Sequence, residues 1–183
     1  QDVQLVWTDS KVALGRLEIL PDVALIEMHA DWSSQLKGIA QLQFLTAEIT
    51  VELSENITAK LHSGSLDAAT LAQRFQLDLP LDCSLSSLDA RVDNWRDPVP
   101  TWKICCDLDL ANIEYGDYQL ENTKLHFIQT DGAYELKLDT IFMKAPLEAE
   151  FKGTWANMTA VSWWLDTDLQ YQISCTELAN IPS

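Results

Sequence analysis

Two pairs of aspartates have a spacing that could support chemistry. Asp107 and Asp109 are separated by one residue, as are Asp166 and Asp168, so each pair lies on one face of a strand. Paired carboxylates can carry out acid–base catalysis or bind calcium. In this chain, however, 28 Asp and Glu accompany only 12 Lys and Arg, and the water-facing side of a strand explains both pairs better. We therefore predict that none of these aspartates is catalytic.

The remaining reactive side chains also lack the spacing of a known site. The three histidines, His29, His62 and His126, do not have the i, i+4 spacing of a helical zinc site. We expect His29 and His126 to face solvent. Cys105 and Cys106 are adjacent, so their side chains point to opposite faces of a strand, unlike a C-x-x-C pair. We predict no metal ligands, no cofactor-binding residues, no bound cofactor and no enzymatic activity.

Three of the four cysteines are in phase with the apolar residues of their strands, namely Cys83, Cys106 and Cys175. One interpretation is that they are small buried hydrophobic residues. The other is that two of the three form a structural disulfide, provided that the protein lies outside the cytoplasm. The sequence leaves the pairing open.

Three tryptophans, Trp155, Trp163 and Trp164, cluster near the C-terminal end of the chain. Trp163 and Trp164 are adjacent within a predicted strand, so one of them must face away from the core. They could pack against a loop, or they could form an aromatic edge for a partner or a membrane interface. We therefore treat these three residues as candidate interaction aromatics.

Composition indicates one folded domain that spans residues 1–183. Apolar residues make up 47% of the chain and include seven tryptophans, which is enough for a core and argues against disorder. The net charge of −16 argues against nucleic acid and against anionic lipid surfaces, since both need a basic footprint. We expect the acidity to keep an apolar β-domain soluble, or to form an acidic face for a basic partner.

Apolar and polar residues alternate along most of the chain, which predicts ten to twelve short strands. The period changes to that of a helix only at Ala68, Leu71, Ala72 and Phe75, with Ser65 as a plausible N-cap. Pro80 then begins one predicted strand, and Leu88 to Val92 form another. A phase slip at Phe44–Leu45 predicts a bulge or a tight turn, and Asp131–Gly132 predicts a hairpin.

These elements predict an all-β fold: a single curled antiparallel sheet, open like a groove or half-barrel, with one short amphipathic helix. Each strand is apolar on one side, so the sheet should curl around that side. Such a groove could hold a lipid-like chain, although composition alone favours a groove that is filled by its own side chains.

The pattern resembles the protein N family of bacterial type II secretion systems. The likeness is carried by LVW at 5–7, LDAATLA at 66–72, LPLDCSL at 79–85, NW at 94–95, YGDYQL at 115–120 and KGTW at 152–155. The glycine common after the L-P-L element is replaced here by Asp82–Cys83. A more distant likeness is to the AsmA-like periplasmic proteins, whose curled sheets are linked to lipid handling.

The resemblance implies a non-enzymatic accessory component of the secretion apparatus that acts by contact with other secretion-system proteins. It also implies a periplasmic location and an anchor in the inner membrane, which we expect to lie upstream because the chain begins at Gln1 and has no apolar run of the ~18 residues that a spanning helix needs. The alternative is a module that binds or transports a lipid or another amphiphile in an apolar groove.

Overall fold

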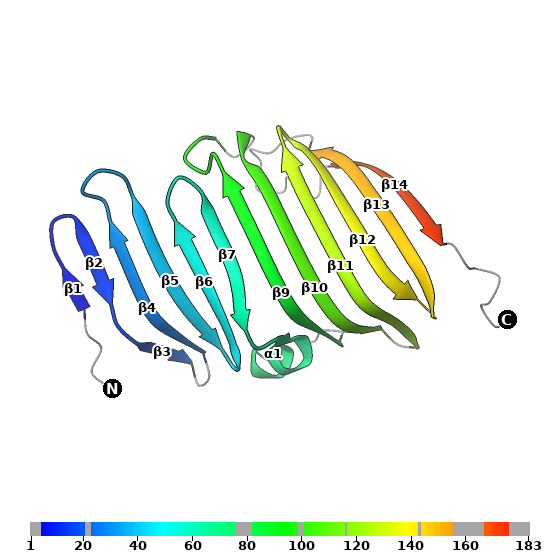
Figure 1. Ribbon diagram of the computed structural model, residues 1–183, viewed down its shortest axis with the longest axis horizontal. Helices are drawn as coiled ribbons and strands as arrows, with labels where there is room; N and C mark the ends of the chain where they lie inside the picture. The colour runs from blue at the N-terminus through cyan, green and yellow to red at the C-terminus, as the bar shows by residue number, and fades with distance from the viewer. Residues whose placement is uncertain are drawn as a thin grey trace.

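A computed structural model describes residues 5–20, 23–75, 82–98, 101–115, 117–142, 144–155 and 167–175. Fourteen antiparallel strands form one sheet, and a single short helix lies at its lower edge (Figure 1). The elements are β1 (Leu5–Trp7), β2 (Lys11–Leu14), β3 (Leu17–Leu20), β4 (Val23–Asp31), β5 (Lys37–Phe44), β6 (Ala47–Leu53), β7 (Ile57–Ser63), β8 (Leu66–Asp67), α1 (Ala68–Phe75), β9 (Asp82–Asp93), β10 (Lys103–Tyr115), β11 (Tyr118–Thr130), β12 (Ala133–Phe142), β13 (Ala145–Trp155) and β14 (Thr167–Cys175). The all-β, single-sheet prediction is confirmed.

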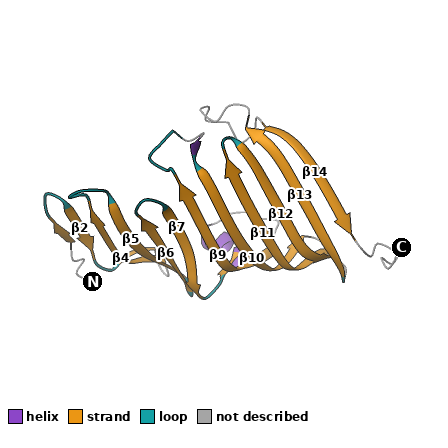
Figure 2. Cartoon of the chain, turned by 45° about the horizontal axis from the view of Figure 1, so that its top comes forward, coloured by secondary structure: helices purple, strands orange, loops and turns teal. Residues whose placement is uncertain are grey.

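The strand order follows the chain. Twelve strands form a path that begins at β1 and ends at β14, while β3 pairs only with β4 and β8 only with β9. The two ends of this path do not pair with each other, so the sheet is open, and Figure 2 shows that it is bent rather than flat. Within the described residues, no helix has the length and apolar character needed to cross a membrane.

The predicted helix is confirmed, but its cap differs from the prediction. Asp67, and not Ser65, caps α1, because its carboxylate accepts a hydrogen bond from the backbone N–H of Thr70 at 2.8 Å. The Thr70 hydroxyl donates to the same carboxylate, and the two hydrogen bonds from Thr70 hold the pKa of Asp67 below its usual value. Leu66 and Asp67 form the short strand β8, so the helix starts directly from the sheet.

Strand β9 corrects a second expectation. The sequence predicts two strands around Leu85 and Leu88, whereas the structure has one strand with a bulge at Ser86. Leu85 pairs with Leu110 and Ser87 pairs with Asp109, which leaves Ser86 as the extra residue. The bulge restores Leu85 and Leu88 to the same face, and this explains the phase change in the sequence.

Two predicted turns are confirmed. Leu45 has a φ of 55° and lies in the tight turn between β5 and β6. Asp131 and Gly132 have φ values of 52° and 78° and connect β11 to β12, as expected for a two-residue hairpin with both central residues in the left-handed region.

The ladder between β7 and β9 is short. This seam contains only four residue pairs, which join Ile57–Lys60 to residues 89–92. Above it, the Arg96 side chain donates to the carbonyls of Leu36 at 2.9 Å and Ser54 at 3.2 Å, and the Trp95 indole also donates to Ser54 at 3.2 Å. The Arg96 guanidinium lies 4.8 Å from the centre of the Trp95 ring. These two side chains therefore tie the half that precedes the seam to the half that follows it.

Little of the described chain is fully buried. The buried apolar residues are mostly small: Ala24, Leu25, Ala47, Ala72, Ala145 and Ala149. The buried pair Thr123 and Thr140 share a hydrogen bond of 2.7 Å between their hydroxyls. The chain exposes 12134 Å², whereas a compact monomer of 20.6 kDa exposes about 8,900 Å². This excess is what a single layer without a second layer over it would produce.

Candidate functional site

The most extensive feature of the molecule is a continuous apolar face. Residues that are paired across antiparallel strands point to the same side of the sheet, so the pairing register can be followed from one edge to the other. One such row crosses all twelve strands of the main path: Leu5, Leu14, Met28, Ala40, Val51, Ala59, Ala90, Cys106, Phe127, Leu136, Phe151 and Tyr171. We call this the central row, and at ~4.8 Å per strand it is about 50 Å long.

The neighbouring row on the same face is also apolar over β9 to β14. It consists of Leu88, Leu108, Leu125, Leu138, Ala149 and Ile173. None of the central-row residues whose exposure is described is fully buried, and Leu5 is 60% exposed. The main contacts of α1 are with β8 and β9, in the middle of the strand order, so most of this face lies beyond the helix. The described chain therefore presents a wide apolar surface without covering it.

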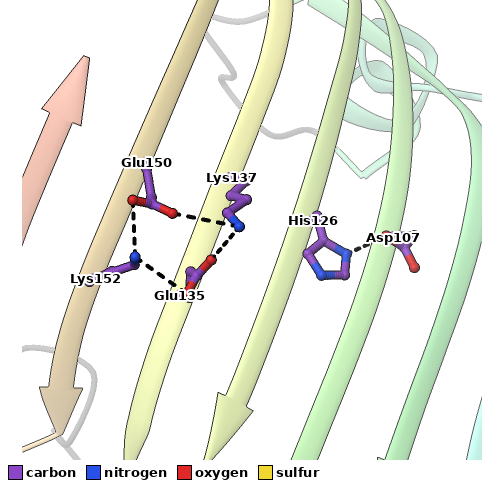
Figure 3. Close-up of polar contacts among 6 residues, drawn as sticks. All are labelled: Asp107, His126, Glu135, Lys137, Glu150 and Lys152. Atoms are coloured by element: carbon purple, nitrogen blue, oxygen red, sulfur yellow. Dashed lines mark hydrogen bonds and ion pairs between the residues drawn. The ribbon is translucent and has the colours of Figure 1, made fainter. Parts of the chain in front are cut away.

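The opposite face is polar and carries most of the charge. On β12 and β13, Glu135, Lys137, Glu150 and Lys152 form a closed square of ion pairs (Figure 3), with N–O distances of 2.7, 3.6, 3.0 and 3.7 Å. The hydrogen bond from Lys137 lowers the pKa of Glu135 and in turn raises the pKa of Lys137, while the bond to Glu150 raises the pKa of Lys152. Each of these exposed ion pairs adds little stability, but together they indicate that this face is in contact with solvent.

Two hollows lie on the polar face and not on the apolar one. Each has a volume near 530 Å³; one is lined by His29, Ile39 and Glu52 and the other by Ile128 and Glu135, among other residues. Both are open and bordered by charged side chains. These two hollows therefore differ from the enclosed pocket that binds most small cofactors.

The N-terminal edge extends the apolar face with exposed aromatic residues. In β1, Leu5 and Val6 are each 60% exposed and Trp7 is 69% exposed. Trp7 contacts Trp32 with 5.6 Å between ring centres, and the Trp32 indole donates to the carbonyl of Asp9 at 2.9 Å. Within the described residues β1 has a strand partner on one side only, so its outer side is an edge that another strand could extend.

Of the predicted interaction aromatics, Trp155 lies within the described residues, and its strand is far from this edge in the strand order. Trp155 ends β13, where its backbone pairs with Thr167, and Trp163 and Trp164 lie outside the described residues. Sequence reasoning missed Trp7 and Trp32, which are 25 residues apart and meet because β2 pairs with β4. The alternation of Leu5 and Trp7 was the available signal, but nothing local indicates where β1 would lie.

The candidate disulfide cysteines occupy separate places in the sheet. Cys106 carries a free thiol and pairs in register with Ala90, seven residues along β9 from Cys83. At ~3.3 Å per residue this separation is roughly 23 Å, far more than a disulfide spans. Cys175 ends β14, with three strands between it and β10. Register thus keeps Cys106 from bridging to either of the other two, while burial raises the pKa of its thiol.

Asp107, Asp109, His29 and His126, for which the sequence predicts no catalytic role, lie on the polar face. Asp107 and Asp109 are exposed on one side of β10, as expected for a water-facing strand, while Asp166 lies outside the described residues and Asp168 lies in β14. His29 is exposed, as predicted, and its imidazole lies 3.5 Å from the Glu27 carboxylate. His126 is only half-exposed and contacts Asp107, a contact that the sequence reasoning missed.

Comparison with protein-family models, with curated proteins and with solved structures finds no match to this chain. The fold and the two contrasting faces are therefore the basis of a functional assignment.

Proposed function

We propose that this chain is a non-enzymatic module that holds the acyl chains of an amphiphile, such as a phospholipid, against its apolar face. The observation that supports the proposal is the central row, which crosses twelve strands without a charged residue. An exposed apolar surface of this extent marks an interaction site.

The composition of the second row favours acyl chains over a protein partner. Protein interfaces have cores rich in aromatic residues, Met and Arg, with about one hydrogen bond per 100–200 Å². The central row contains Met28 and three aromatic residues, but the second row consists of aliphatic residues alone, from Leu88 to Ile173. Acyl chains offer no hydrogen-bonding groups, so they match this second row, whose side chains have none.

A rough magnitude indicates which lipids would bind. Full burial is worth ~0.8 kcal/mol per CH₂, so a chain of about 16 carbons with one side against the sheet gains roughly 6 kcal/mol. Association costs about 4–15 kcal/mol. A single fatty acid should therefore bind weakly, whereas a two-chain phospholipid should bind measurably.

Native mass spectrometry of protein purified without detergent from an envelope-containing host tests this proposal. We expect adducts in the phospholipid mass range that disappear after organic extraction, and restored binding of a fluorescent diacyl phospholipid to the extracted protein. Matched variants sharpen the test, because Leu138→Gln and Asp139→Gln place the same side chain on the two faces of β12. We expect a Kd at least tenfold higher for Leu138→Gln and a change within about twofold for Asp139→Gln.

Two results would overturn the proposal. One is an apo mass together with no binding of the phospholipid to the extracted wild-type protein. The other is an equal loss of binding in both variants, which would mean that the apolar face does not contact the lipid.

The exposed edge favours a second candidate function, which is protein contact within a secretion apparatus. The resemblance to the type II secretion protein N family suggests a periplasmic accessory component of an inner-membrane-anchored protein. The physical mechanism would be addition of a partner strand to β1. The Thr8 N–H bonds to the Lys11 carbonyl and so points toward β2. Because backbone groups alternate in direction along an antiparallel strand, the N–H and C=O groups of Leu5 and Trp7 point away from β2, toward a possible partner strand.

A pair of variants at Trp7 tests this second function. Trp7→Ala removes the ring, and Trp7→Pro removes both the ring and the outward N–H while keeping the bonds to β2. If secretion components that co-purify with the wild-type protein are retained by Trp7→Ala and lost from Trp7→Pro, β-augmentation is supported. Equal retention by both variants would exclude it.

A further inference from the structure

Three side chains with different metal-binding atoms meet on the polar face, away from the proposed lipid surface. The Cys105 sulfur, a carboxylate oxygen of Asp107 and a ring nitrogen of His126 all lie within 4.8 Å of one another. Figure 3 shows the imidazole of His126 facing Asp107 across the gap between β11 and β10, with Nδ1 and Oδ1 2.5 Å apart. Cys105 and Asp107 are two residues apart on β10 and therefore share a face.

We propose that Cys105, Asp107 and His126 form a binding site for Zn²⁺. Thiolate, imidazole and carboxylate are the three donor types that zinc takes from proteins, and three protein ligands leave a fourth position for water. Asp107 is exposed and the other two residues are half-buried, so an ion can reach the site from solution. The open position would face solvent, where a substrate or a side chain of a partner could occupy it.

The scaffold holds the three donors in place before an ion arrives. The register of β10 and β11 keeps one alignment from Ile104 opposite Gln129 to Tyr115 opposite Tyr118, without a bulge. The site lies near one end of this regular pairing, where Cys105 is opposite Ile128 and Asp107 is opposite His126. Because the ladder fixes the backbone there, rotations of the three side chains suffice for coordination.

The charge of Asp107 favours a cation at this site. Asp89 lies opposite Asp107 in β9, but Lys60 balances its charge at 2.9 Å. Arg91 lies opposite Cys105 and pairs with Asp93 at 2.7 Å. Lys137 lies opposite His126 and pairs with Glu135 at 2.7 Å. Other carboxylates therefore engage these three cations, and the Asp107 carboxylate can bind an ion.

Cobalt(II) is a suitable probe, because a thiolate ligand gives it a sulfur-to-metal charge-transfer band in the near ultraviolet. The chain supplies its own control, since Cys105 and Cys106 are adjacent and lie on opposite faces of β10. We expect one Co²⁺ per chain, displacement by Zn²⁺, loss of the band in Cys105→Ser and an unchanged band in Cys106→Ser. His126→Gln should weaken binding by at least tenfold.

Several results would overturn the proposal. They are the absence of the band from the wild-type protein, its persistence in Cys105→Ser, and its equal loss in Cys106→Ser. Circular dichroism of each variant establishes that the sheet is folded. The lipid assay is independent of these measurements, so failure of the zinc site would leave the proposed function standing, and the reverse also holds.

Discussion

Arg96 should stabilise the short seam between β7 and β9, and its replacement tests how the two halves are joined. The guanidinium donates to the carbonyls of Leu36 and Ser54 and stacks on Trp95. Hydrogen bonds from charged groups are worth about 1.5–3 kcal/mol, but both of these are solvent-exposed, so we assign about 0.5–1 kcal/mol to each. An exposed cation–π contact adds about 0.5–1 kcal/mol. Arg96→Ala should therefore lower the free energy of unfolding by about 2 kcal/mol.

Urea denaturation followed by circular dichroism measures this change, and Arg16→Ala provides a control. The Arg16 guanidinium donates to the Gln43 side chain at 3.3 Å on the exposed surface, so its loss should cost less than about 0.5 kcal/mol. Hydrogen exchange should also show faster exchange in Arg96→Ala at residues 57–60 and 89–92, which form the seam. Equal stabilities of the two variants, with unchanged exchange at the seam, would refute the reasoning.

Two further predictions concern backbone geometry and pH. Gly64 has a φ of 74°, and a Cβ there would lie 2.1 Å from the Thr46 carbonyl oxygen, so Gly64→Ala should lower the free energy of unfolding by about 3 kcal/mol in urea denaturation. Gly132 has a φ of 78° in a hairpin, and Gly132→Ala should lower it by only about 1 kcal/mol. Equal losses in the two variants would argue against the steric clash at Gly64. Hydrogen bonds from the backbone and the side chain of Ser33 lower the pKa of Asp31 to about 2. Because the pKa of Asp31 is lower in the folded state than in the unfolded state, its stabilisation of the fold is complete above pH 4 and is lost as the pH falls to 2. The difference in free energy of unfolding between the wild-type protein and Asp31→Asn should therefore shrink over this pH range. A difference that stays constant with pH would contradict the prediction.

Features set by short stretches of sequence were predictable. Alternation of apolar and polar residues indicates the strands and their inner faces, and the apolar spacing from Ala68 to Phe75 indicates α1. The Asp131–Gly132 hairpin follows from two residues that both tolerate a positive φ. All of these depend on contacts within a few residues, which the sequence displays directly.

Features that depend on pairing between strands were not predicted. Strand β9 is one strand instead of the two expected, because β10 pairs with the residues on both sides of the bulge at Ser86. Asp107 and His126 meet because the β10–β11 hairpin sets them opposite each other. Counting outward from the turn between Tyr115 and Tyr118 would have revealed this pairing. The prediction from sequence considered only the i, i+4 spacing of histidines, which applies to helices and not to strands.

The order of the strands also has a consequence for how the chain folds. Nearly every strand pairs with the strand next to it in sequence. Among the described residues, the exceptions on the main path are β2 and β4, which meet across β3, and β7 and β9, which meet across β8 and α1. Chain closure between near neighbours costs little conformational entropy, so successive hairpins can form rapidly and in order. As in a repeat protein, each hairpin depends mainly on its immediate neighbours. During synthesis the sheet can therefore grow from the N-terminal edge, and the pairing of β7 with β9 should be its slowest step. The apolar face is exposed from the first hairpin onward, so it needs protection from aggregation throughout.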